Sequence, residues 1–273
     1  MVGFIGAGNM AEALMRGILK TGIVSPQDIV IADIDQNRIT CLQEKYSVQV
    51  AQNNRDLVSR AEIVILSVKP QVISDVLKEI TSSVEQRTLL ISIAAGITLS
   101  FLKAHLPHNV RIVRVMPNTP ALVLEGMTAI CSDGVNEEDM KRAEQIFSAV
   151  GRVVIIRETL IDAVTGLSGS GPAYVAVLVE ALTDGGVLMG LPRNVSQNLA
   201  LQTVLGSVRL LMDSQEHPAH LKDRVSSPGG TTIHGIYALE KGGFRASLIE
   251  AVRSATIRSQ ELGDEHSHGK VKA

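Results

Sequence analysis

The chain has 273 residues, which is the length of about two ordinary domains. Hydrophobic residues make up 45% and aromatic residues only 3%, so Val, Ile, Leu and Ala dominate, as in parallel strands covered by helices on both faces. A net charge of −2 argues against nucleic-acid and acidic-membrane partners, and without a run of about eighteen apolar residues we expect no membrane span.

The first half alternates short β-branched runs with helix-length segments. The helix-length segments include Met10–Lys20 and Glu137–Val150, which repeat apolar residues at helical spacing. This alternation is typical of βαβ units and predicts a mostly parallel, Rossmann-type α/β sheet. The predicted strands are Val2–Ile5, Ile29–Ala32, Ile63–Val68, Leu89–Ile93, Ile112–Met116, Thr128–Cys131 and Val153–Ile156.

After Ile156 the sequence predicts helices only. We therefore expect a dinucleotide-binding domain over 1–157 and an all-helical substrate and dimerisation domain over 158–273. Segments such as Thr203–Met212 are apolar on more than one side, which favours a dimer built through this domain. The alternative is that these faces pack only on each other and on the first domain. The predicted helices are Gly171–Met189, Pro192–Asp213, Thr231–Lys241 and Phe244–Leu262.

Cysteine and histidine usage points to a reducing compartment and to no metal site. Cys41 and Cys131 are far apart in the chain and form no metal-spaced pair, so we expect a cytoplasmic protein. The chain starts in a strand-like run with no basic segment in front of it, so we expect no signal or transit peptide. His217 and His220 have no evident third ligand. The polar tail 263–273, which carries His266 and His268, is expected to fray.

A glycine-rich loop follows the first predicted strand and opens the first predicted helix. In that setting Gly6 permits a tight turn, Gly8 lets a pyrophosphate approach the backbone, and Ala11 allows close packing of helix on strand. The helix N-terminus offers free N–H groups to the phosphates. We expect a nicotinamide dinucleotide, NADPH or NADH, to be held here by Gly6, Ala7, Gly8, Asn9 and Met10.

The end of the second strand bears on the choice between the two cofactors. Asp33 either accepts hydrogen bonds from the adenosine ribose, which favours NADH, or caps the next helix. For Asp35 we expect the cap. Arg38 and Lys69 are the cations that could face a 2′-phosphate, and Lys69 follows a strand that ends at the same sheet edge.

A second glycine-rich turn lies in the helical half, over 226–233. It runs from Gly229 and Gly230 into a predicted helix that begins with Thr231 and Thr232. Backbone N–H groups at such a helix N-terminus form a carboxylate site, and the hydroxyls can donate or accept there. The alternative is a threonine cap on an ordinary helix.

These motifs together resemble the pyrroline-5-carboxylate reductase family, over nearly the whole chain. The resemblance implies a Rossmann domain, a helical domain that interlocks with a partner in a homodimer, and in some relatives a ring of five dimers. It implies hydride transfer from NAD(P)H to the C=N carbon of 1-pyrroline-5-carboxylate, giving L-proline. The shared motifs are GFIGAGNMAEA, VKP, SIAAGI, MPNTPALV, TGLSGSGPAY, MGLPR, HPAHLKD and SSPGGTTI.

The resemblance also implies roles for individual residues. Thr232 is the catalytic candidate, near the ring nitrogen, and Glu158 matches a position near the substrate. The expected carboxylate contacts are Ser227, Gly229, Gly230, Thr231 and Thr232. The expected cofactor contacts beyond the glycine loop are Asp33, Asn54, Val68, Lys69, Pro70 and Ala95. Asp33 departs from the small or basic residues of many relatives, which puts the usual NADPH preference in doubt.

Two rival functions remain at this stage. A 3-hydroxyacid dehydrogenase would share both halves but depends on a lysine, and Lys222 and Lys241 lie in no matching motif. A non-catalytic dinucleotide sensor would need no carboxylate-binding loop, so the turn at 226–233 argues against it.

Overall fold

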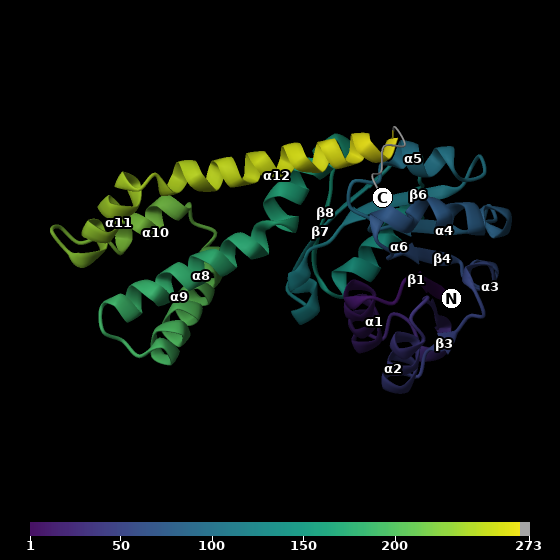
Figure 1. Ribbon diagram of the computed structural model, residues 1–273, viewed down its shortest axis with the longest axis horizontal. Coiled ribbons are helices and arrows are strands. Elements are labelled where there is room, and N and C mark those ends of the chain that lie inside the picture. Colours follow the sequence, from purple (N-terminus) through teal and green to yellow (C-terminus); the bar gives the residue numbers. More distant parts are fainter. Residues whose placement is uncertain (268–273) are drawn as a thin grey trace. The chain divides into compact units, whose positions relative to one another are not determined.

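The computed structural model describes residues 1–267, and they form two compact units. The first comprises Met1–Ser170 together with the chain from Arg253 onward, and the second is Gly171–Val252. Figure 1 shows a sheet with flanking helices in the first and helices alone in the second.

Within the described residues, the strands of the first unit form one eight-stranded sheet in the order β3-β2-β1-β4-β5-β6-β7-β8. All neighbouring strands pair in parallel except β6 and β7, which are antiparallel. The strands are β1 (Val2–Ile5), β2 (Ile29–Ala32), β3 (Gln49–Val50), β4 (Ile63–Leu66), β5 (Leu89–Ser92), β6 (Arg111–Met116), β7 (Gly126–Ser132) and β8 (Gly151–Ile155).

The order of the first six strands is that of the doubly wound Rossmann sheet, which confirms the predicted fold class. The strand order reverses between β1 and β4, and that is where such sheets bind ligands, beyond the carboxyl ends of the strands. The predicted strands all form. The structure adds β3, whose two residues were too short to give a pattern.

Alternate strand residues face opposite sides of the sheet, and each side is covered by its own helices. On β1, Phe4 joins a buried cluster with α1 (Asn9–Lys20), α2 (Gln36–Tyr46) and α6 (Glu137–Ser148). Its neighbour Ile5 joins the cluster on the other face. There it meets α3 (Asn54–Arg60), α4 (Ile73–Ile80), α5 (Leu99–Ala104) and Ile161 of the short helix α7 (Ile161–Val164). The two clusters hold the sheet rigid beneath its carboxyl edge.

The second unit consists of helices, as predicted. They are α8 (Gly171–Leu188), α9 (Arg193–Ser214), α10 (Pro218–Arg224), α11 (Thr231–Lys241) and the first residues of α12 (Phe244–Ser267). Helices α8 and α9 meet where Ser196 Oγ donates to the Thr183 carbonyl at 2.7 Å. Helix α12 continues through Ser267, so the expected fraying from Gly263 is wrong as far as the described residues extend, and residues 268–273 lie outside them.

The structure divides the chain differently from the expected boundary at residue 157. Ile161 is buried in the sheet core, and Asp162 Oδ1 accepts from Ser259 Oγ of α12 at 2.7 Å. Because these contacts join both ends of the helical half to the sheet, the first unit extends to Ser170 and takes in the end of α12.

Candidate functional site

The glycine loop forms a tight turn between β1 and α1. Gly6 has a φ of +93°, and a Cβ placed there would lie 2.7 Å from the carbonyl oxygen of Ser67. Only glycine fits both restrictions without strain. Gly8 is the N-cap of α1, and no atom lies within 4 Å of its notional Cβ. The open space above Gly8, at a helix N-terminus, fits a pyrophosphate group.

Three side chains hold this loop: Asp33 and Ser67 follow neighbouring strands, and Arg38 lies on α2. Asp33 Oδ2 accepts from the Ala7 amide at 2.5 Å, and Arg38 Nε donates to the Ala7 carbonyl at 2.7 Å. Ser67 Oγ donates to the Gly6 carbonyl at 2.6 Å. The loop is therefore set in place before any ligand arrives.

Glu12 organises a charged cluster on the outer face of α1. Its carboxylate accepts hydrogen bonds from Arg38, from Lys45 at 2.9 Å and from Tyr46 at 3.1 Å. Burial raises the pKa of Glu12, but the hydrogen bonds from Lys45, Arg38 and Tyr46 outweigh it and lower the pKa to about 2. Glu12 is thus ionised at physiological pH and holds the Arg38 guanidinium on the side of α1.

A cavity of about 700 Å³ opens beside the loop, outside the carboxyl ends of β1, β2 and β4. Its wall brings together the predicted residues Gly6, Asp33, Asn54 and Val68. Apolar walls and a polar rim at this position fit an adenosine group. The other lining residues are Ile5, Ala32, Ile34, Gln36, Ile39, Val50, Ala51, Gln52, Asn53, Val72, Asp75, Val76 and Glu79.

Several predicted cofactor contacts lie beyond this cavity. Asn9 and Met10 begin α1, with Asn9 exposed and Met10 half-buried. Lys69 is exposed and Pro70 half-buried where the 3-10 helix η2 (Pro70–Val72) starts after β4. Ala95 is exposed in the turn after β5. All follow strands at the same edge of the sheet.

Sequence reasoning missed the wall that β3 and α4 contribute. Asn53 caps α3 by accepting from the Asp56 amide, and Glu79 of α4 accepts from Asn54 Nδ2 at 2.8 Å. The Asn53-to-Asp56 cap could have been found as a helix-start signal. Asp35 caps α2 by accepting from the amides of Asn37 and Arg38, as predicted.

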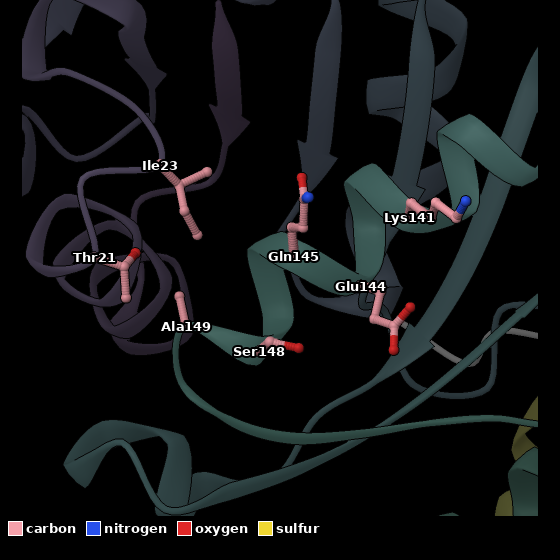
Figure 2. Close-up of a pocket in the computed structure, with 7 residues that line it drawn as sticks. All are labelled: Thr21, Ile23, Lys141, Glu144, Gln145, Ser148 and Ala149. Carbon is pink, nitrogen blue, oxygen red and sulfur yellow. The ribbon is translucent and has the colours of Figure 1, made fainter.

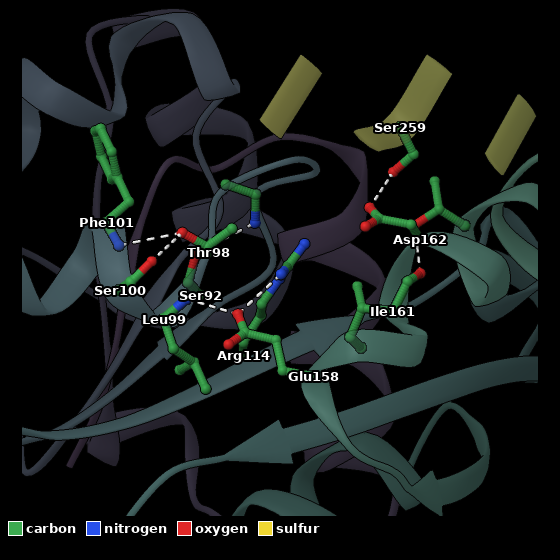
Figure 3. A network of polar contacts seen from close by, with 12 residues as sticks. Ser92, Thr98, Leu99, Ser100, Phe101, Arg114, Glu158, Ile161, Asp162 and Ser259 are labelled. Atoms are coloured by element: carbon green, nitrogen blue, oxygen red, sulfur yellow. Dashed lines mark hydrogen bonds and ion pairs between the residues drawn. The ribbon is translucent and has the colours of Figure 1, made fainter. Parts of the chain in front are cut away.

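Glu158 lies in a polar network and is half-buried, with 32% of its side chain exposed. Its Oε1 accepts from Arg114 Nη1 at 2.9 Å and from the Leu99 amide at 2.7 Å, as Figure 3 shows. The Arg114 side chain is 5% exposed. Burial raises the pKa of the nearby Cys131 thiol to about 11, so that cysteine is not a nucleophile.

The loop before α11 is exposed on the second unit. Gly229 has a φ of +64°, and the Gly230 amide donates to the Ser227 carbonyl at 3.0 Å. Gly230 is the N-cap of α11, so the threonine-cap interpretation is wrong. Since glycine has no capping side chain, the first-turn N–H groups of Thr231 and Thr232 are left for an anion.

A second hollow, of about 380 Å³, lies by the C-terminal end of α1 and is lined in part by Thr21, Lys141 and Ser148 (Figure 2). Helix α1 has 12 residues and so is about 18 Å long. The hollow is therefore at the opposite end of α1 from the glycine loop and is no part of the cofactor site.

The first unit is thus the nucleotide-binding half of an oxidoreductase. Its family follows from the similarity of the chain to known proteins. The family described as "NADP oxidoreductase coenzyme F420-dependent" matches residues 1–96, and "Pyrroline-5-carboxylate reductase dimerisation" matches residues 158–262. The chain therefore carries a dimerisation domain.

Full-length relatives agree with these matches. A pyrroline-5-carboxylate reductase of Synechocystis sp. is 50% identical over 96% of this chain and 98% of its own. One from Arabidopsis thaliana is 45% identical over 96% and 95%. The crystal structure of the Plasmodium falciparum pyrroline carboxylate reductase with NADP bound has a TM-score of 0.87 at 36% identity, covering 96% of this chain and 97% of that one. The chain belongs to the pyrroline-5-carboxylate reductase family, and it is an NAD(P)-dependent oxidoreductase.

Substitutions of the two loop glycines are expected to affect different properties: the Gly8 variant loses cofactor affinity, and the Gly6 variant loses stability. Gly8→Ala keeps the fold, because its Cβ meets open space, but that Cβ occupies the place of the pyrophosphate and weakens NADH binding about tenfold or more. Gly6→Ala lowers the free energy of unfolding by about 2 kcal/mol or more, because its backbone conformation and its contact with Ser67 are both strained. Urea unfolding and titration of NADH fluorescence measure the two quantities. Equal loss of stability in both variants would contradict this account of the loop.

Proposed function

We propose that this protein reduces 1-pyrroline-5-carboxylate to L-proline, with NAD(P)H as the hydride donor. The observation that carries the proposal is the conjunction of a preformed dinucleotide loop at Gly6–Met10 with an uncapped helix N-terminus at Thr231 and Thr232. The first suits the cofactor and the second suits the carboxylate of the substrate. The family membership supports both assignments.

The chain's residues act mainly by holding and orienting. When bound, the reduced nicotinamide supplies the hydride. The α1 N-terminus and the Gly8 backbone would hold the pyrophosphate, and Asn54, Val68, Lys69, Pro70 and Ala95 would contact the cofactor along the same sheet edge. An imine that is already protonated needs little acid catalysis, so positioning supplies most of the rate.

The loop before α11 positions the substrate. The N–H groups of the first turn of α11 and the Ser227 and Thr231 hydroxyls bind the carboxylate, and Gly229 and Gly230 shape the turn that exposes them. The Thr232 hydroxyl hydrogen-bonds near the ring nitrogen. Glu158, which belongs to the first unit and matches a position near the substrate in the family, is held by its ion pair with Arg114.

The assembly we propose is a homodimer formed through the second unit, and in turn a ring of five such dimers. Within residues 171–252, all of which are described, only Thr183, Ser196 and Ala200 are buried. Leu188 is 84% exposed and Leu205 65% exposed. An exposed apolar surface of this size is typical of a protein–protein interface, and the dimerisation family matches this region.

The stretch Glu158–Leu188 is apolar enough to cross a membrane by length and composition alone. The stretch has no unbroken apolar run, but its glycine and hydroxyl residues lower its mean hydropathy only slightly. The stretch lies within the residues that the dimerisation family matches, so we propose that a second copy of the chain covers its exposed apolar side chains. Cys41 and Cys131 are unpaired, which fits a reducing cytoplasm.

The direct test of the activity is a reductase assay. Purified protein with 1-pyrroline-5-carboxylate and NADH or NADPH is expected to form proline with matching loss of reduced cofactor. A dehydrogenase assay with 3-hydroxyacids and the oxidised cofactors serves as the control for the rival enzyme. Folded protein that binds NADH but forms no proline with either cofactor contradicts the proposal.

Thr232→Ala is expected to lower kcat about 10- to 150-fold, because a hydrogen bond to a charged group is worth about 1.5–3 kcal/mol. The Kd for NADH should stay within about twofold, since the residue lies in the substrate loop. Thr232→Ser keeps the hydroxyl and should restore most of kcat. An unchanged kcat/KM in Thr232→Ala would show that the hydroxyl plays no part in the reaction.

Light scattering is expected to give a mass of two or ten times the 29.2 kDa of one chain. Leu205→Asp places a charge on the exposed apolar surface of α9 and should shift the protein toward monomer. The control is Ile23→Asp, at an exposed position beside the hollow of Figure 2, which should leave the mass unchanged. An active wild-type monomer at assay concentration would rule out the dimer.

A further inference from the structure

The charged side chains that line the adenosine cavity are all acidic. Three carboxylates line it, those of Asp33, Asp75 and Glu79, and among the described residues no lysine or arginine does. The two cofactors differ only by a phosphate on the adenosine ribose, which carries about two negative charges and requires cations or N–H donors for binding. The wall of this cavity instead places carboxylates, which repel a phosphate, around the expected position of the ribose.

Asp33 is held in place at the position where the ribose is expected. Its Oδ2 accepts from the Ala7 amide at 2.5 Å and its Oδ1 from the Asp35 amide at 2.9 Å. Each carboxylate oxygen can accept more than one hydrogen bond, so ribose hydroxyls can still bind. The two amide contacts fix the carboxylate, so it cannot swing away from an incoming 2′-phosphate.

Most of the described cations on nearby elements already have hydrogen-bond or ion-pair partners, and none of them lines the cavity. Arg38 donates to the Ala7 carbonyl and to Glu12, and Lys45 also binds Glu12. Arg55 Nε donates to the Glu79 carbonyl at 2.9 Å, and Lys78 pairs with Asp75 at 3.3 Å. Lys69 is exposed at the start of η2 and does not line the cavity.

We propose that this cavity selects NADH over NADPH, with Asp33 as the residue that excludes the 2′-phosphate. Glu12 is a positioning residue: it keeps Arg38 on the side of α1, where the guanidinium cannot receive that phosphate. A relative with this fold has been solved with NADP bound, so the fold itself does not exclude the 2′-phosphate, and any selection lies in the side chains of the cavity. The inference rests on the proposed function only for the identity of the cofactor class.

The test measures binding of each cofactor without substrate, by titrating the fluorescence of the reduced nicotinamide at low ionic strength. Wild type is expected to bind NADH roughly tenfold or more tightly than NADPH, because like charges a few ångströms apart near a surface repel by a few kcal/mol. Added salt should narrow this ratio, since screening weakens the repulsion. The quantity compared is the ratio of the Kd for NADPH to the Kd for NADH. A variant that loosens the loop weakens the binding of both cofactors and leaves this ratio unchanged.

Variants separate the roles of the two carboxylates. Asp33→Ser should shift the ratio toward NADPH by about tenfold or more, and adding Glu12→Gln, which removes the carboxylate partner of the Arg38 guanidinium, should shift it severalfold further. The matched control is Asp35→Asn, a carboxylate two positions away that caps α2 and does not line the cavity, and it should leave the ratio unchanged. Thermal melting of each variant shows that it is folded.

The result that overturns the inference is a wild type that prefers NADPH and loses that preference in Arg38→Gln, because Arg38 would then serve the phosphate. An unmoved ratio in Asp33→Ser overturns it as well. Binding needs no substrate, so this outcome is separate from the reductase assay. A protein that prefers NADH but makes no proline refutes the activity alone, and one that makes proline but binds NADPH more tightly refutes the selectivity alone.

Discussion

The backbone conformation at Gly6 is the constraint on which the cofactor site depends. Its positive φ and its approach to the Ser67 carbonyl turn the chain from β1 straight into α1, and this turn points the helix N-terminus at the carboxyl edge of the sheet. Asp33, Arg38 and Ser67 then fix the loop from three sides. A loop already in its binding conformation loses little entropy when the cofactor arrives, so more of the contact energy appears as affinity.

The two units differ in how they are stabilised. The first buries apolar residues on both faces of its sheet and has a complete core. The second holds a helical hairpin through the Ser196–Thr183 contact but buries almost no apolar side chain of its own, so its stability depends on another surface. The loop that we assign to the substrate belongs to this second unit. The proposed dimer interface and the proposed substrate loop therefore lie on the same unit, and the glycine loop lies on the other.

The sequence predicted the parts that follow from local pattern. Apolar runs placed β1 and β2 at their observed bounds, the glycine spacing predicted the tight turn between β1 and α1, and Asp35 was recognised as a helix cap. Contacts between distant residues could not be predicted in this way. The approach of Glu12 to Arg38, the burial of Arg114 against Glu158 and the cavity wall from β3 and α4 all depend on tertiary packing. The bond from Asp33 to Ala7 is the most informative of these, because it gives one carboxylate a structural role beside the predicted ribose contact.

The central claim is that the cofactor held by the glycine loop delivers a hydride to a cyclic imine. The most direct measurement uses NADH carrying deuterium at the transferable position of the nicotinamide, with mass spectrometry of the product. The account predicts L-proline with one deuterium, on the ring carbon that was double-bonded to nitrogen. Proline without label, or consumption of NADH without labelled proline, would contradict it.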